Sequence, residues 1–136
     1  MNDNNMLEIL SPAGDMERLL AALDFGADAV YLGGKMFGMR AGSPNFTAED
    51  LKIAADETHK RGKRLYLTCN TLPRNNEIIH FEQFVKDAVD AKIDALIAND
   101  IGVFSLIKKF APDMEIHVST QAGIVNFVTA NEFYNM

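Results

Sequence analysis

The sequence predicts an α/β fold built from five consecutive βα units whose strands run parallel. Short apolar runs alternate with helical stretches of about 10–15 residues, and each such helix can return the chain to the start of the next parallel strand. The segment DFGADAVYLGG, residues 24–34, also recurs as DAKIDALIAND, residues 90–100, with Asp94 in the place of Asp28. This recurrence indicates a structural unit that is used more than once.

The first two strands are predicted at residues 7–10 (LEIL) and 29–32, because both runs are apolar and both are followed by turn residues. SPAGD is the loop after the first strand. Asp15 is the predicted N-cap of a helix over residues 16–25, which ends before Gly26. After the second strand, glycines open a long loop that extends to residue 46.

Residues 47–50, TAED, match a capping box and predict a helix over residues 48–60. The third strand follows at residues 63–70, and TLPRNNE is predicted to be its loop, with Pro73 favouring a turn. The next helix carries apolar residues from 78 to 88. These elements complete the third unit and lead into the fourth.

The fourth strand is predicted at residues 94–98, and Asn99 or Asp100 is expected to cap the helix that ends before Pro112. Residues 115–119 form the fifth predicted strand. A fifth helix is expected to begin after Gln121.

Alternation of polar and apolar residues within the strands distinguishes a barrel from an open sheet. The polar members of one face are Glu8, Tyr66, Thr68, Asn70, His117 and Ser119, and the apolar members of the other are Leu65, Leu67, Ile116 and Val118. Both faces of an open doubly wound sheet are covered by apolar helices, whereas the mouth of a barrel tolerates polar groups. The sequence therefore predicts part of a TIM-like (β/α)₈ barrel. Since such barrels take about 250 residues, residues 1–136 are expected to form a single partial barrel domain with its first five strands.

Composition limits the classes of function. The chain is 48% hydrophobic and has one cysteine, which excludes an internal disulfide and a metal site built of several thiolates within it. A net charge of −6 argues against this chain as the main electrostatic platform for nucleic acid. No apolar run approaches the roughly 18 residues of a membrane-spanning helix, and no secretory signal is recognised. We expect a cytoplasmic protein that does not enter a membrane.

Five motifs occur in order along the chain: EILSPAGD at residues 8–15, GADAVYLGG at 26–34, FGMRAG at 37–42, NF at 45–46 and HVSTQA at 117–122. Together they resemble the amino-terminal part of peptidase family U32, the collagenase-like proteases. The resemblance covers nearly the whole chain after Met6. It implies a TIM-like barrel that continues to a cysteine-rich segment, before which this chain is truncated.

The family resemblance implies two kinds of activity for the full-length protein. One is peptidase activity, including collagen degradation. The other is oxygen-independent hydroxylation of uridine or cytidine in tRNA or rRNA, or of a quinone precursor. For hydroxylases the resemblance implies a 4Fe–4S cluster held by the later cysteines, with prephenate required by the tRNA members. No cofactor is expected within this chain, since Cys69 does not match a cluster ligand by position.

The candidate site residues lie at or near the predicted strand ends, where a barrel binds its ligands. His117 and Ser119, two apart on one strand face, are the catalytic candidates. The candidate substrate-binding residues are Glu8, Tyr31, Arg40, Asn70, Thr120 and Gln121. No nucleophile elbow or zinc-binding His-Glu-x-x-His pattern occurs, and no metal site is predicted. Cys69 is expected to be a buried residue that points away from the mouth.

The leading hypothesis is the amino-terminal part of an iron–sulfur RNA hydroxylase-like enzyme, most closely a tRNA uridine hydroxylase. One alternative is a peptidase that acts on a protein substrate. Another is an inactive fragment or half-barrel. Because five parallel strands without closure leave two open edges, we expect self-association or a missing carboxyl-terminal part that covers them.

Overall fold

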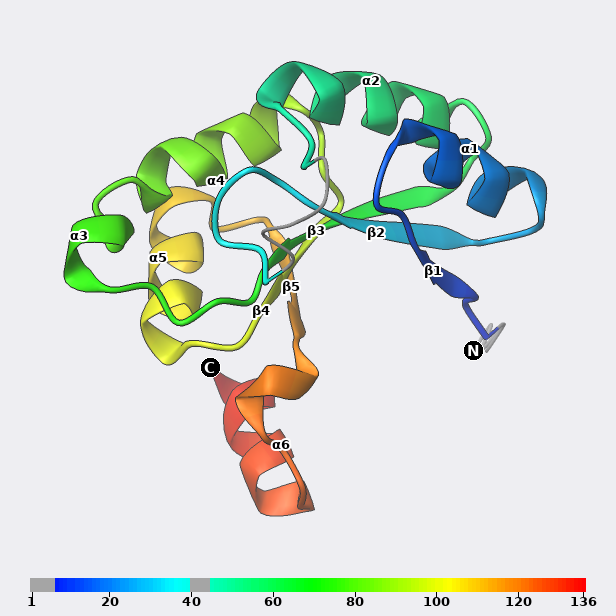
Figure 1. Ribbon diagram of the computed structural model, residues 1–136. Coiled ribbons are helices and arrows are strands. Elements are labelled where there is room, and N and C mark those ends of the chain that lie inside the picture. The colour runs from blue at the N-terminus through cyan, green and yellow to red at the C-terminus, as the bar shows by residue number, and fades with distance from the viewer. Residues whose placement is uncertain (1–6, 40–44) are drawn as a thin grey trace.

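The computed structural model describes residues 7–39 and 45–136, in which five parallel strands alternate with helices. The strands form one sheet in the order β1-β2-β3-β4-β5 (Figure 1). The elements are β1 Leu10–Pro12, α1 Met16–Asp24, β2 Ala29–Gly33, α2 Ala48–His59, β3 Arg64–Cys69, α3 Asn75–Ile78, α4 Phe81–Asp90, β4 Ala95–Ala98, α5 Ile101–Phe110, β5 Glu115–Val118, the 3₁₀ turn η1 Thr120–Ala122 and α6 Phe127–Asn135. Sequential parallel order is the arrangement of a TIM-like barrel, as the sequence predicts.

The helices begin where their capping side chains predict. The Asp15 carboxylate accepts a hydrogen bond from the Arg18 N–H at the start of α1. Thr47 and Asp50 form a reciprocal capping box at the start of α2. Of the two candidate caps for α5, Asp100 is the one used, because its side chain accepts from the Val103 N–H.

The main core lies between the sheet and the helices α1, α2, α4 and α5, which lie along one side of it (Figure 1). Leu67, Leu96 and Ile116 are in register across β3, β4 and β5 and face the helices; the first two are buried in this core, and Ile116 is partly buried against it. The residues that alternate with these along the strands, including Tyr66 and Ala95, pack together on the inner, concave face, which is the face turned away from the helices. The predicted apolar outer face is confirmed, whereas the inner face combines the polar side chains Thr68 and His117 with apolar ones such as Ala95 and Ile97.

The two recurring segments make equivalent backbone connections. The Asp28 carboxylate accepts from the Ile9 N–H at 3.0 Å, while the Asp28 N–H donates to the Ile9 carbonyl. The Asp94 carboxylate accepts from the Leu65 N–H at 2.7 Å, and the Asp94 N–H donates to the Leu65 carbonyl. Each aspartate thus ties the start of its own strand to the start of the preceding one.

The first strand lies three residues later than the sequence predicts. The sequence predicts the strand at residues 7–10, but Leu7 is 94% exposed and pairing begins at Leu10. Ser11 and Pro12, which read as loop residues, pair with Val30 and Tyr31. Proline is compatible with this position because β1 is an edge strand, where a missing N–H removes no bond to a further strand.

The stretch predicted as one helix over residues 78–88 is divided into α3 and α4. Residues 75–77 are predicted to end the loop after β3, but together with Ile78 they form a single helical turn. The Glu77 carboxylate accepts from the Arg74 N–H at 2.7 Å, which supports this turn locally. After β5, the 3₁₀ turn η1 precedes α6, so the last helix begins after Gln121 as expected.

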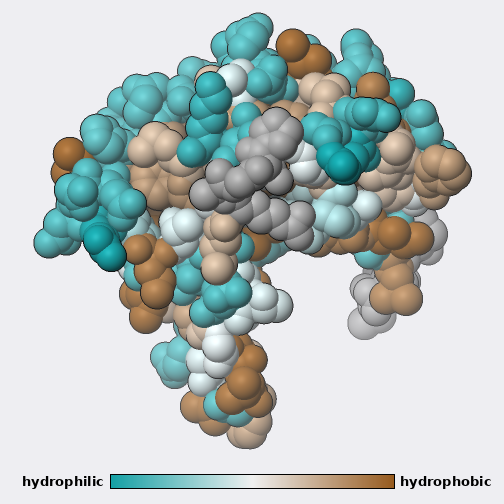
Figure 2. All heavy atoms as spheres, in the orientation of Figure 1, coloured by the Kyte–Doolittle hydropathy of each residue, from teal (hydrophilic) through white to brown (hydrophobic). Residues whose placement is uncertain are grey.

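Apolar side chains are exposed at both ends of the sheet, over the segment that leads into β1 and over α6 (Figure 2). On α6 and the residues before it, the most exposed are Val125, Phe127 and Tyr134. The expectation that another copy or further sequence covers these edges stays a prediction. In the described part of the chain, every helix lacks the length or the apolar content that spanning a bilayer requires.

Candidate functional site

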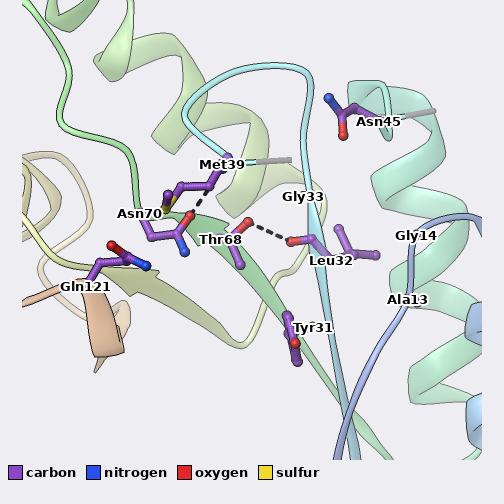
Figure 3. Close-up of a pocket in the computed structure, with 11 residues that line it drawn as sticks. Ala13, Gly14, Tyr31, Leu32, Gly33, Met39, Asn45, Thr68, Asn70 and Gln121 are labelled. Carbon is purple, nitrogen blue, oxygen red and sulfur yellow. Dashed lines mark hydrogen bonds between the residues drawn. The ribbon is translucent and has the colours of Figure 1, made fainter. Parts of the chain in front are cut away.

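A cavity of about 290 Å³ lies at the carboxyl ends of β1, β2 and β3 (Figure 3). This is the end of a parallel βα array at which ligands bind. It is lined by Ala13, Gly14, Tyr31, Leu32, Gly33, Gly38, Met39, Asn45, Thr68, Asn70 and Gln121.

β3 supplies the polar wall of the cavity through its alternation. Tyr66, Thr68 and Asn70 are each two residues apart, so they share the inner face, and the latter two reach the cavity. The Thr68 hydroxyl donates to the Leu32 carbonyl at 3.2 Å, which ties β3 to β2 beside the cavity (Figure 3).

The loop after β2 closes one side of the cavity, and Phe37 anchors it. The Phe37 ring is buried against the rings of Phe81 and Phe84 in α4, with centroids 5.1 Å from each. Its backbone has a φ of 63°, a left-handed conformation that is unusual for a bulky residue. The Phe37 carbonyl accepts from the Thr71 N–H at 3.1 Å. These contacts hold the adjoining cavity residues against the end of β3.

Two further hydrogen bonds and one close backbone approach position this loop. The Met39 N–H donates to the Asn70 side-chain oxygen at 3.4 Å (Figure 3). A Cβ atom at Gly38 would lie 3.3 Å from the Thr68 hydroxyl oxygen, so the backbone approaches β3 more closely there than most side chains allow. At the far end of the loop, the Phe46 N–H donates to the Gly33 carbonyl and brings Asn45 to the cavity.

Among the described residues that line the cavity, none carries a charged side chain. Its polar groups are hydroxyls and carboxamides: those of Tyr31, Asn45, Thr68, Asn70 and Gln121. Such a site suits a neutral group recognised by hydrogen bonds better than it suits a phosphate or carboxylate, which positive side chains usually bind.

A second polar cluster lies on the concave face, around Tyr66. The Tyr66 hydroxyl donates to the Glu8 carboxylate, with O–O distances of 2.8 and 2.9 Å. The His117 ring meets the Tyr66 ring edge to face at 4.6 Å, and His117 Nε2 lies 2.7 Å from Glu115 Oε1. Arg64 lies over the Tyr66 ring and forms an ion pair with Glu115 at 2.5 Å. These five side chains form one continuous network.

The network shifts the pKa values of Arg64, Tyr66 and Glu115, and the shifts of the last two decide how they hydrogen-bond. Burial first, and then the hydrogen bond to Glu8, raises the pKa of Tyr66 far above its usual value. The hydrogen bond from His117, supported by Arg64, lowers the pKa of Glu115. Tyr66 is therefore a neutral donor and Glu115 an ionised acceptor at neutral pH.

The structure brings three of the predicted substrate residues together: Tyr31, Asn70 and Gln121 all line the cavity. Thr120 is exposed beside Gln121 in η1. Glu8 lies before β1, at the other end of the sheet, and contacts Tyr66 instead. Arg40 lies outside the described residues.

Of the two catalytic candidates, His117 lies in β5, and Ser119 follows the last residue of that strand as the N-cap of η1. His117 belongs to the network around Tyr66, whereas Ser119 is buried and its hydroxyl oxygen accepts from the Gln121 N–H at 3.3 Å. In the described part of the chain, no hydrogen bond joins His117 to Ser119. Their catalytic role stays a prediction.

The cysteine lies where the sequence places it. Cys69 is 1% exposed, belongs to the core between sheet and helices, and burial raises its pKa to about 12. Within residues 7–39 and 45–136, no group of three or more histidine, cysteine, aspartate or glutamate side chains could hold a metal ion.

Sequence reasoning did not place Thr68 and Asn45 in the site. The signal for Thr68 was available, because it lies between Tyr66 and Asn70 on the inner face of β3. Asn45 has no such signal, since it reaches the cavity only through the path of a long loop.

Residues 14–136 match the sequence model of peptidase family U32. Similar curated proteins include tRNA hydroxylation protein P of Haemophilus influenzae, which is 37% identical over 129 residues, 95% of this chain and 28% of the relative. Collagenase of Porphyromonas gingivalis is 38% identical over 99% of this chain and 32% of its own length. The 23S rRNA 5-hydroxycytidine C2501 synthase of Escherichia coli is 35% identical over 89% of this chain and 18% of its own length. The chain thus spans a third or less of the length of these relatives.

Solved structures support the fold. A U32 peptidase structure superposes with a TM-score of 0.62 at 12% identity, covering 83% of this chain and 47% of that one. Phosphoribosylanthranilate isomerase from Thermotoga maritima gives a TM-score of 0.58 at 14% identity, covering 82% of this chain and 52% of that one. At these identities the likeness concerns the fold alone, which is the five-stranded part of a TIM-like barrel.

Proposed function

This chain belongs to peptidase family U32, and we propose that it is the amino-terminal portion of an enzyme that hydroxylates a pyrimidine base in RNA, as a tRNA uridine hydroxylase would. Several relatives at 36–38% identity are named tRNA hydroxylation protein P, from three different organisms. Another relative is named for the synthesis of 5-hydroxycytidine in 23S rRNA. The names agree on hydroxylation of RNA although the RNA differs.

The observation that carries the proposal is the cavity at the carboxyl ends of the strands, whose described lining residues carry no charge. Enzymes that modify a base bring it out of its stack into a pocket and read its edge by hydrogen bonds. Carboxamides and hydroxyls, here those of Thr68, Asn70 and Gln121, offer donors and acceptors of the kind that a base edge needs. The role of this chain is then to bind and orient the base.

The residues of this chain do not fit the 4Fe–4S cluster that the family resemblance implies. Such a cluster is held by about four cysteine thiolates, and the chain has one cysteine, which is buried in the core with a raised pKa. We propose that the cluster ligands, and the site for prephenate if the enzyme modifies tRNA, are supplied by sequence outside this chain.

A peptidase is the second candidate, favoured by the 38% identity to a collagenase. Nucleophilic hydrolysis needs a hydroxyl or thiol with a base in hydrogen-bond reach. Cys69 is buried away from the cavity, and Ser119 and His117 are each bonded to other partners. The described residues therefore favour base binding over peptide hydrolysis.

The test is made on the full-length protein and its gene. Deleting the gene should remove one hydroxylated pyrimidine from the cellular RNA, detected by mass spectrometry of nucleosides as the loss of one oxygen atom. Restoring the wild-type gene should return it, and restoring the Asn70→Ala variant should return less. Unchanged RNA in the deletion strain, together with cleavage of denatured collagen by the purified protein, would instead establish the peptidase.

A further inference from the structure

Asn99 is a buried polar residue that the site as described does not use. It follows directly after β4 and is 9% exposed. Its side-chain oxygen is buried without a hydrogen-bond partner, and no other buried side-chain nitrogen or oxygen of the described residues is in that state. Leaving a buried acceptor unpaired costs about 1–3 kcal/mol, so its retention requires an explanation.

The fold itself does not require this side chain. Asparagine before a helix commonly serves as an N-cap, but α5 is capped by the neighbouring Asp100, which accepts from the Val103 N–H at 2.9 Å. The backbone carbonyl of Ala98 accepts from the Ser119 N–H at 2.7 Å, so the pairing of β4 with β5 also proceeds without it. The side-chain amide of Asn99 is therefore needed neither to cap α5 nor to pair β4 with β5.

The register of the sheet places Asn99 on the inner face beside the cavity, although Asn99 is not itself one of the residues that line it. Thr68, Ile97 and His117 are in register across β3, β4 and β5. Two residues further along each strand, and therefore on the same inner face, come Asn70, Asn99 and Ser119. Asn99 thus lies between a residue that lines the cavity and the residue that caps η1, where Gln121 reaches the cavity.

The neighbouring amide has a defined orientation. The Asn70 oxygen accepts from the Met39 N–H, so its amino group is the part that can donate to a ligand (Figure 3). Asn99 contributes the opposite group, an unpaired acceptor. A donor beside an acceptor complements a ring N–H beside a carbonyl, which is the arrangement on the pairing edge of uracil.

We propose that Asn99 determines base specificity: its side-chain oxygen accepts a hydrogen bond from the ring N–H of a uracil base held at the mouth. This inference rests on the proposed function and names the group that the site recognises. The oxygen is covered in this structure, so it meets the base when the amide turns about its last side-chain torsion, which is soft in asparagine.

The test compares two short single-stranded RNAs that differ by one methyl group: one carries uridine and the other N3-methyluridine at the same position. The full-length wild-type protein should bind the uridine RNA about 10–100-fold more tightly, since the methylated ring leaves a buried acceptor unpaired. In Asn99→Leu, whose side chain also branches at Cγ but has no polar atom, the uridine RNA should lose about the same factor and the preference should vanish. Asn99→Asp keeps an acceptor oxygen and should keep the preference.

Gln83→Ala is the matched control, because Gln83 is a carboxamide on α4 that bonds Asp87 and lies outside the cavity. Its binding should equal that of the wild type. A preference for uridine that persists in Asn99→Leu would overturn the role of Asn99 while leaving RNA binding intact. Failure of the wild type to bind either RNA would defeat the proposed function and this inference with it. If Asn99→Leu does not fold, Asn99→Ala is measured and judged by the same criterion.

Discussion

Phe37 is the residue on which the shape of the cavity most depends, and Phe37→Ala should destabilise the protein strongly. Its ring is 8% exposed and packs edge to face against two phenylalanine rings of α4. Truncating a phenylalanine in such surroundings costs about 3–5 kcal/mol, from lost burial and from the cavity left behind. With a urea m-value of about 2 kcal/mol/M, the midpoint of unfolding should fall by about 1.5–2.5 M.

A second substitution separates packing from backbone strain. Because Phe37 has a φ of 63°, glycine should tolerate the position better than alanine by about 1 kcal/mol. Phe37→Gly should therefore be more stable than Phe37→Ala, the reverse of the usual order. Native-state hydrogen exchange should also show faster exchange at the Thr71 amide in both variants, since this N–H donates to the Phe37 carbonyl.

Phe25 offers the matched control, because it is 93% exposed at the end of α1. Phe25→Ala should change the free energy of unfolding by no more than about 0.5 kcal/mol. A cost below about 1 kcal/mol for Phe37→Ala, or equal costs for the two alanine variants, would refute the view that Phe37 anchors the loop.

Three further predictions concern the repeated units and the cysteine. Lys92 occupies the helix-end position that Gly26 occupies in the first repeat, and both residues have a positive φ. In urea unfolding, Lys92→Gly should leave the free energy of unfolding unchanged or raise it by up to about 1 kcal/mol, whereas Gly26→Ala should lower it by about 1 kcal/mol. The hydrogen bond from Lys63, followed by that from the Ile9 N–H, lowers the pKa of Asp28 in the folded chain. The contribution of Asp28 to stability should therefore be complete above about pH 4 and should be lost as the pH falls through its folded pKa. Thermal unfolding between pH 5 and 2 should show that the melting temperature of Asp28→Asn falls less steeply than that of the wild type. Cys69 should resist alkylation by iodoacetamide at pH 8 in the folded protein and react once urea unfolds it, because its thiol is buried and its pKa is about 12; rapid labelling of the folded protein would contradict this burial.

The sequence predicts most of the fold because its signals are local. Helix starts follow from capping side chains such as Asp15 and Thr47, and the inner and outer faces of β3 follow from strict alternation. The repeat of Asp28 at Asp94 also has a physical meaning, since both carboxylates accept a backbone N–H from the preceding strand. The caps depend on neighbours close in sequence and the strand faces on a period of two, while the role of the two aspartates is visible in the sequence only as a repeated segment.

The misplacement of β1 has a different origin. Its position is decided by pairing with Ala29 to Tyr31, a long-range contact, whereas apolar character alone points to Leu7. Pro12 is read as a strand breaker, yet at an edge it costs no bond to a further strand. Local propensity here gives way to the register that the neighbouring strand imposes.

The site is predicted less completely than the fold because a cavity combines residues from several loops. Asn70 and Gln121 could be chosen from their positions just past strand ends, which a barrel makes meaningful. Asn99 occupies the same kind of position, but asparagine before a helix is also a common cap, and only the bond from Val103 to Asp100 decides between the two roles. The sequence alone therefore does not show which of the two residues caps α5.

The distribution of charge bears on how such a site would engage RNA. The chain has a net charge of −6, and the described lining of its cavity is uncharged. Affinity for RNA comes largely from cations that contact phosphates, whereas discrimination comes from contacts to base edges. An acidic chain with amides and hydroxyls among the described residues of its cavity is suited to the second task and poorly suited to the first. If the enzyme acts on RNA, its phosphate contacts must therefore come mainly from outside this chain, and base recognition is the part of the work for which these residues are arranged.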